Sequence, residues 1–166
     1  MFVLGIDPGL TTTGYAAVIG GSSEPRAVAA GVIRTDPAAS VGRRLVELHH
    51  DLSEILAEHK PDVVAIEQVF VNLNRVTATS VGRAAGVAIL AAAQAGAEVV
   101  EYPPTKVKLA VTGDGAADKR QVTAMVARRL GLAVPPHPAD AADALAVALC
   151  HLQAARWSKP SAREAS

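Results

Sequence analysis

The 166-residue sequence contains a single cysteine, Cys150, so no disulfide can form within the chain. Only 3% of the residues are aromatic although 50% are hydrophobic, so the core must consist mainly of Ala, Val, Leu and Ile. Cys150 lies in an Ala- and Leu-rich helical pattern, and we expect a buried thiol in a reducing, cytoplasmic protein. The length suits one domain, residues 1–155, followed by a tail, 156–166, that is expected to be disordered.

Long apolar runs and an excess of charge are also lacking. No run of membrane-spanning length and no basic N-terminal region is found, so neither an anchor nor a signal peptide is expected. The net charge is zero, which taken alone argues against a nucleic-acid partner. However, residues 1–69 hold five basic and nine acidic side chains, whereas residues 70–135 hold eight and four. This asymmetry is compatible with a basic DNA-binding surface, and an ordinary fluctuation of surface charge is the alternative.

Hydrophobic periodicity divides the chain into strands and helices. Strands are predicted over 2–6, 14–19, 26–35, 62–67 and 97–101, and helices over 41–59, 75–95, 105–111, 119–130 and 139–155. Ser40 and Asp118 are the expected N-caps of two of these helices. Three antiparallel strands followed by alternating helices and strands are typical of the ribonuclease-H-like fold. We therefore predict a five-stranded mixed sheet with helices on both faces.

Four acidic residues stand where this fold would bring them together. Asp7 and Glu67 each end a predicted central strand, and Pro8-Gly9 turns the chain away after Asp7. Asp140 and Asp143 are three residues apart at the start of the last helix, so they lie on one stripe of it. Each acid also has a plain structural alternative, because Asp7 could cap its own turn and acids near a helix N-terminus favour its dipole.

Four converging carboxylates would repel one another unless cations were bound among them. Oxygen-only ligands favour Mg²⁺, with Mn²⁺ as a substitute, and two ions per site suit phosphodiester hydrolysis. His137, three residues before Asp140, could reach the same place, but an exposed loop position is the favoured interpretation.

Four motifs together resemble the RuvC-type Holliday-junction resolvases. They are GIDPGLTTTGY at 5–15, AIEQVF at 65–70, TGDGAADKRQV at 112–122 and ADAADALAVA at 139–148. Each motif is weak alone, but the four occur in order over nearly the whole chain. The resemblance implies a Mg²⁺-dependent homodimeric endonuclease that nicks two strands of a four-way DNA junction symmetrically, leaving 5′-phosphate and 3′-hydroxyl ends. It also implies a branch-migration complex of the RuvA–RuvB type as partner.

The same resemblance assigns roles to individual residues. It implies that the catalytic residues are Asp7, Glu67, Asp140, Asp143 and Lys119, with the four acids as metal ligands. Phe70 would stack on a base at the opened crossover, and Lys108 and Lys119 match basic positions that contact the scissile region. Asn74, Arg75 and Arg120 are further candidates for DNA contacts, although the resemblance does not assign them. The structural alternatives are a core phenylalanine and solvated basic side chains. The segment after Phe70, VNLNRV, departs from the lysine-containing segment often found in the family, and Asn74 and Arg75 could substitute for it.

The predicted helix over 75–95 is crowded with Gly and Ala, which permits close approach of another backbone. A dimer interface and packing on the sheet are both compatible with this pattern. Three other functions are alternatives. An ATP-using phosphotransferase of the actin and sugar-kinase class needs a longer, two-lobed chain. A ribonuclease-H-like nuclease acting on RNA precursors does not match the second and fourth motifs. A non-catalytic junction-binding protein would not need four acids.

Overall fold

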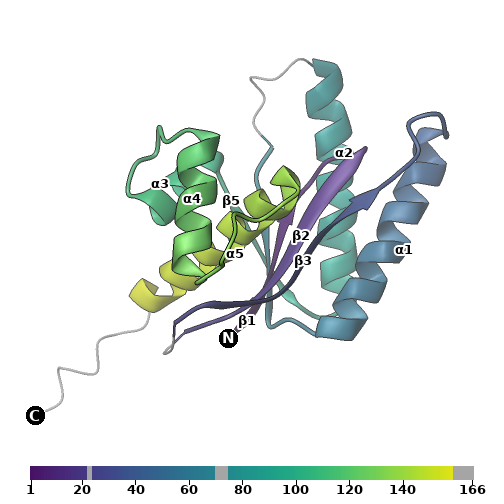
Figure 1. Ribbon diagram of the computed structural model, residues 1–166. Coiled ribbons are helices and arrows are strands. Elements are labelled where there is room, and N and C mark those ends of the chain that lie inside the picture. Colours follow the sequence, from purple (N-terminus) through teal and green to yellow (C-terminus); the bar gives the residue numbers. More distant parts are fainter. Residues whose placement is uncertain (22–23, 70–74, 159–166) are drawn as a thin grey trace, which may run out of the picture.

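The computed structural model describes residues 1–21, 24–69 and 75–158, and its strands form one mixed sheet (Figure 1). The strands are β1 Phe2–Asp7, β2 Thr12–Ile19, β3 Arg26–Arg34, β4 Val63–Glu67 and β5 Glu98–Tyr102. Their order in the sheet is β3-β2-β1-β4-β5. The β1–β2 and β2–β3 pairs are antiparallel, whereas β4 runs parallel to both β1 and β5. The predicted five-stranded mixed sheet is confirmed.

The helices cover both faces of this sheet. Helices α1 (Val41–His59) and α2 (Arg75–Gln94) pack on one face, and α3 (Pro104–Thr112), α4 (Lys119–Arg129) and α5 (Ala139–Ser158) lie on the other (Figure 1). Each face has its own apolar core, because successive strand residues point to opposite sides of the sheet. Aliphatic side chains dominate both cores, as the composition predicts, and Cys150 is buried in the core beneath α5.

The ends of the helices follow local signals in the sequence. The Ser40 hydroxyl accepts the amide N–H of Arg43, and α1 ends at Lys60 in a left-handed conformation (φ 47°). Asp118 and Gln121 form a reciprocal capping box at the start of α4. Helix α5 continues to Ser158, beyond the predicted end at residue 155. The rest of the expected tail, 159–166, lies outside the described residues.

Helix α5 lies directly on the backbone of the sheet. A side chain at Gly5 would collide with the backbone carbonyl of Ala144, and one at Gly14 would collide with the carbonyl of Asp140. Glycine inside a strand permits such an approach because it has no Cβ. These two contacts allow α5 to lie close to β1 and β2, with its first turn directly over Gly14.

Helix α2 bears on the expectation that no segment is long and apolar enough to span a membrane. The helix has 20 residues, and an 18-residue window in it has a mean hydropathy of 1.4, so by length and composition alone it could cross a membrane. Its apolar character comes largely from small residues. One side, including Ala84, Ala88 and Ala92, is buried in the core beneath α1 and α2. Packing in this core explains why that side of α2 is apolar.

Candidate active site

Asp7 and Glu67 lie side by side at one edge of the sheet. Ile6 pairs with Ile66 in the parallel β1–β4 ladder, and each acid is the next residue and the last of its strand. The two carboxylates therefore leave adjacent strands at the same level. The sheet fixes both backbones. Two acids that each end a strand in the sequence therefore become neighbouring side chains in the structure.

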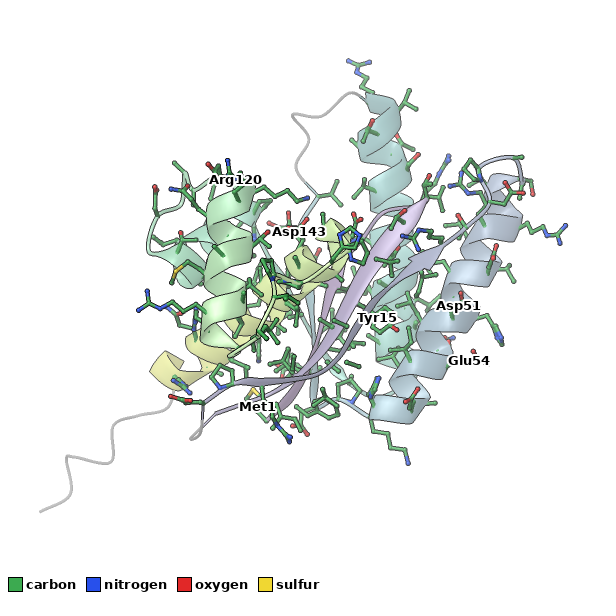
Figure 2. The ribbon with its side chains drawn as sticks, viewed as in Figure 1. Met1, Tyr15, Asp51, Glu54, Arg120 and Asp143 are labelled. Atoms are coloured by element: carbon green, nitrogen blue, oxygen red, sulfur yellow. The ribbon has the colours of Figure 1, made fainter. Side chains whose placement is uncertain are left out.

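Asp140 and Asp143 reach this edge from above, on the first turns of α5. The close contact between Gly14 and the backbone of Asp140 holds the helix start over β2, which is paired with β1. Figure 2 shows Asp143 on the inner part of the molecule, where α5 begins. Both aspartates repel the carboxylate of Asp7 electrostatically, so the four predicted acids form one group.

The electrostatics of the group raise two pKa values. Burial is the main cause of a rise in the pKa of Asp7 to about 7, and the charges of Glu67, Asp143 and Asp140 add to it. Burial also raises the pKa of Glu67 to about 7, with Asp143 as the next cause. Partly buried carboxylates that repel one another favour protonation, and a bound cation would remove that preference.

Lys119 lies within this acidic group. Its Nζ is 2.6 Å from Oδ2 of Asp143, and this hydrogen bond is the main cause of a raised pKa for the Lys119 ammonium. The four acids therefore converge with a basic side chain beside them, at the residue to which the family resemblance gives a catalytic role. The Asp118 cap places Lys119 at the first position of α4, facing the start of α5. The spacing of the motifs gave no signal of this pair, because it depends on how α4 packs against α5.

The group opens into a small cleft of about 200 Å³. Two acids and two lysines line it, with apolar side chains beneath: Glu67, Asp143, Lys108, Lys119, Pro104, Val107, Val122 and Ala146. Lys108 acts on the charge of Glu67, lowering its pKa against the effect of burial. The cleft thus joins anionic and cationic groups at one place, which suits a phosphate ester approaching a metal site.

The other predicted residues fall into two sets. Phe70 and Asn74 lie outside the described residues. Arg75 is exposed at the start of α2. Arg120 is exposed beside Lys119 and projects from the outer end of α4 (Figure 2), and His137 is exposed as expected.

Gly14 was not predicted to belong to the site, although a glycine inside a strand is a signal of close backbone approach.

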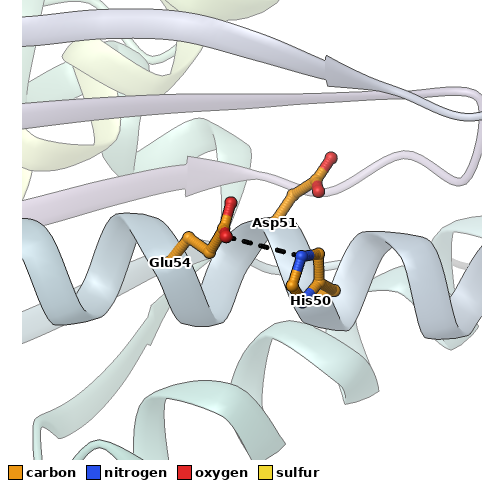
Figure 3. Close-up of side chains that lie close together, drawn as sticks. All are labelled: His50, Asp51 and Glu54. Atoms are coloured by element: carbon orange, nitrogen blue, oxygen red, sulfur yellow. Dashed lines mark ion pairs between the residues drawn. The ribbon is translucent and has the colours of Figure 1, made fainter.

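A separate group of possible metal ligands lies on α1. The ligand atoms of His50, Asp51 and Glu54 are within 4.8 Å of one another, and Nε2 of His50 is 3.4 Å from Oε1 of Glu54 (Figure 3). In the described part of the chain no three of the four acids at the sheet edge are spaced as tightly. The α1 group is largely exposed, comes from one helix and lies on the opposite face of the sheet from α5.

Comparison with known proteins decides the family. A family model described as crossover junction endodeoxyribonuclease RuvC matches residues 3–151. The chain belongs to the RuvC family. A crossover junction endodeoxyribonuclease RuvC from Salinispora arenicola is 52% identical over 153 residues, covering 92% of this chain and 87% of that protein.

Solved RuvC structures agree with this assignment. Thermus thermophilus RuvC is 38% identical and superposes with a TM-score of 0.87, covering 95% of this chain and 96% of that chain. The same relative in complex with Holliday junction substrate gives a TM-score of 0.90 with the same coverage. The ribonuclease-H-like fold predicted from the order of elements is therefore confirmed. The RuvC match spans all four acids, from the end of β1 to the start of α5.

Proposed function

We propose that this protein resolves four-way (Holliday) DNA junctions in recombination and repair, as a divalent-metal-dependent endonuclease. Membership of the RuvC family supports the reaction, and the Thermus structure with junction substrate supports the substrate class. The observation that carries the proposal is the convergence of Asp7, Glu67, Asp140 and Asp143 at one sheet edge, two of them with raised pKa values.

The donors fit a hard divalent cation. All four are carboxylates; burial first, and then repulsion within the group, raises the pKa values of Asp7 and Glu67, so a bound cation would stabilise their ionised forms. We assign these two residues, with Asp140 and Asp143, as ligands of two Mg²⁺ ions that Mn²⁺ can replace. Such ions, when bound, lower the pKa of water and stabilise the charge of the leaving oxygen.

The reaction is hydrolysis of a phosphodiester. A water oxygen bonds to phosphorus while the bond to the 3′-oxygen breaks, which leaves a 5′-phosphate and a 3′-hydroxyl. One water proton passes to a carboxylate oxygen of the group, and the departing 3′-oxygen takes up a proton from solvent water. Lys119 stabilises the negative charge that grows on the phosphate, and its bond to Asp143 holds the ammonium beside the cleft. Lys108 adds positive charge at the cleft wall.

Recognition of the junction is assigned to residues around the cleft. Phe70 follows the strand that ends at Glu67 by three residues, and we propose that its ring stacks on a base at the opened crossover. Arg75 and Arg120 are exposed and contact phosphates, together with Asn74. Unstacking a base step costs a few kcal/mol, which these backbone contacts offset.

A homodimer provides two equal sites for two equal strands. Helix α2 is the proposed interface, because its outer side carries Gly82, Gly86 and Leu90 at helical spacing. A side chain at either glycine would meet no atom within 4 Å, so internal packing does not require these glycines. Leu90 is 52% exposed. Close approach of two α2 helices accounts for both features.

The family resemblance supports two further assignments. We propose that the dimer works with a branch-migration complex of the RuvA–RuvB type, which supplies the junction. We also place the protein in the cytoplasm, where a buried free thiol such as that of Cys150 stays reduced.

Cleavage of a mobile four-way junction in Mg²⁺ tests the proposal. Asp7→Asn removes one charge and keeps the shape of the side chain, so cleavage should fall by a factor of about 10³ or more while junction binding remains. Asp51→Asn makes the same change in the exposed α1 group and should leave cleavage unaltered. Equal cleavage by Asp7→Asn and wild type would refute the catalytic assignment.

The proposed stacking of Phe70 on a base is tested separately with Phe70→Ala. This variant should slow cleavage more than it weakens binding, because the ring acts on the opened crossover rather than on the duplex arms. If cleavage is unchanged, Phe70 is a packing residue.

A further inference from the structure

Arg44 is a deeply buried cation for which the proposed reaction gives no role. It lies on the first turns of α1 and is 8% exposed. Among the residues that the structure describes, no other arginine and no lysine, aspartate or glutamate is buried as deeply. Its guanidinium bonds to two hydroxyl groups, and no carboxylate in the same part of the chain forms an ion pair with it. A buried charge without an acidic partner is costly, so the packing of its apolar stem does not explain why an arginine stands here.

The hydrogen bonds of Arg44 converge on the turn that follows Asp7. Its Nε donates to Oγ1 of Thr35 (2.8 Å), directly after β3, and its Nη2 donates to Oγ1 of Thr11 (2.8 Å), in the β1–β2 turn. The Thr35 hydroxyl in turn donates to the carbonyl of Leu10 (2.6 Å), and the Thr35 amide N–H donates to the carbonyl of Thr11 (3.2 Å). One planar guanidinium therefore joins α1, the end of β3 and this turn in a fixed geometry.

The chain after Asp7 needs such support more than the chain before it. Asp7 is the last residue of β1, so the ladder holds its N-terminal side, whereas residues 8–11 lie outside both strands. The other three acids of the group repel the Asp7 carboxylate. This repulsion favours displacement of Asp7 away from the group, and the bonds to Thr11 and Leu10 oppose that movement. Functional side chains keep a precise position only when the residues that carry them are held in this way.

We propose that Arg44 is a positioning residue of the nuclease site: its guanidinium holds the turn after Asp7 against α1 and β3, and so keeps the Asp7 carboxylate in place to bind the metal with the other acids. This inference rests on the proposed function, in which Asp7 is a metal ligand. Arg44 acts through Thr11, Thr35 and Leu10, not by contact with the metal or the DNA. The alternative is structural: Arg44 only fastens α1 to the sheet, and its loss changes stability but not metal affinity.

Arg44→Met tests the proposal, because it keeps an apolar stem and removes the guanidinium without leaving a buried charge. Its free energy of unfolding, measured with urea in a chelator, should be equal to or higher than that of wild type. The Mg²⁺ dissociation constant from thermal unfolding, and the Mg²⁺ concentration for half-maximal junction cleavage, should both rise about tenfold. Arg44→Lys keeps the charge but not the planar geometry and should recover little of either. Arg43→Met removes a charge from the neighbouring exposed position and should alter neither.

The turn itself can be followed without metal or DNA. Hydrogen exchange of the backbone amides of residues 9–13 should be faster in Arg44→Met than in wild type, and unchanged in Arg43→Met. Thr11→Val removes the hydroxyl that accepts from Nη2 of Arg44 and should also weaken Mg²⁺ binding. The double variant should bind Mg²⁺ no more weakly than Arg44→Met, because both substitutions remove the same bond.

Wild-type Mg²⁺ affinity in Arg44→Met would show that the proposal is wrong and that Arg44 only attaches α1. If Arg44→Met does not fold, Thr11→Val gives the same decision, because Thr11 is exposed and its substitution leaves the core intact. The failure of the proposed function has a different result. A wild-type protein that binds Mg²⁺ but does not cut the junction refutes that function, while the Mg²⁺ affinities of the variants still decide the role of Arg44.

Discussion

The carboxyl group of Asp7 holds a proton more tightly in the folded protein than in the unfolded chain. Its pKa rises from an ordinary 3.8 to about 7, mainly through burial. Between these two values the folded state binds more protons than the unfolded state, so the free energy of unfolding falls as pH rises through this window. The loss is at most about 4 kcal/mol, since one pKa unit corresponds to about 1.4 kcal/mol.

Asp7→Asn should therefore be more stable than wild type at neutral pH when no divalent ion is present. The neutral amide removes a buried charge and its repulsion with Glu67 and Asp143. The stability difference should be larger at pH 8 than at pH 5, as measured by urea unfolding in a chelator. A pH-independent difference would show that the variant acts through packing instead.

At the scale of residues, the sequence predicts which acids meet but not how their charges are balanced. Asp7 and Glu67 could be predicted because a strand end positions a side chain directly. The ion pair of Lys119 with Asp143 could not, because it joins two helices whose relative position is decided by core packing.

The position of α5 depends on two glycines in the strands beneath it. Gly14→Ala should lower the free energy of unfolding by about 1–3 kcal/mol, because the added methyl group collides with the backbone of Asp140. Cleavage should fall as well, since the same collision displaces the start of α5. Gly42→Ala is the matched control, because its Cβ meets no atom within 4 Å and should add up to about 1 kcal/mol of helix stability. Equal stability of the two variants would contradict the close-contact argument.

A substitution on the outer side of α2 tests whether this side forms the proposed dimer interface. Gly86→Glu places a charge where the proposed partner helix approaches, while glutamate favours a helix more than glycine does. Sedimentation velocity should then show a monomer that is at least as stable to unfolding as a wild-type protomer. Val46→Glu on the exposed side of α1 should leave the dimer intact, since Val46 is 71% exposed outside that interface. A dimeric Gly86→Glu variant would exclude this face.

At the scale of elements, the sequence predicts best where local signals act. The bounds of α1 were predicted correctly, because Ser40 caps its start and Lys60-Pro61 follows its end. The end of α5 was placed too early, since the Ala-rich pattern has no stop signal before residue 158. Which of the glycines in α2 face outward could not be predicted, because small residues lie on both of its sides.

For the whole molecule, the bound cation should contribute to stability as well as to cleavage. At Mg²⁺ concentrations about 100-fold above the dissociation constant, linkage adds about 2.7 kcal/mol to the free energy of unfolding. Thermal unfolding of wild type should therefore shift upward by several degrees. Asp7→Asn should lose most of this shift, and Asp51→Asn should keep it. An equal shift in both variants would assign metal binding to a place other than the sheet edge.

The fold as a whole could be predicted from the order of its elements. Three consecutive strands, then helices alternating with two more, leave few arrangements that bury every apolar face. The two layers then follow, because α1 and α2 connect parallel strands on one side of the sheet. The cleft beside the acids could not be predicted in this way, because it is a space that remains between elements and no single segment encodes it.

The contact of α5 with Gly5 and Gly14 also has a consequence during synthesis of the chain. Asp7 and Glu67 leave the ribosome early, whereas Asp140 and Asp143 follow only after all five strands have been made. A nascent chain that lacks α5 therefore holds only two of the four acids, and one face of its sheet lacks the helix that forms most of the core on that side. If the four acids form the nuclease site as proposed, cleavage is expected only after α5 has emerged and packed on the two glycines.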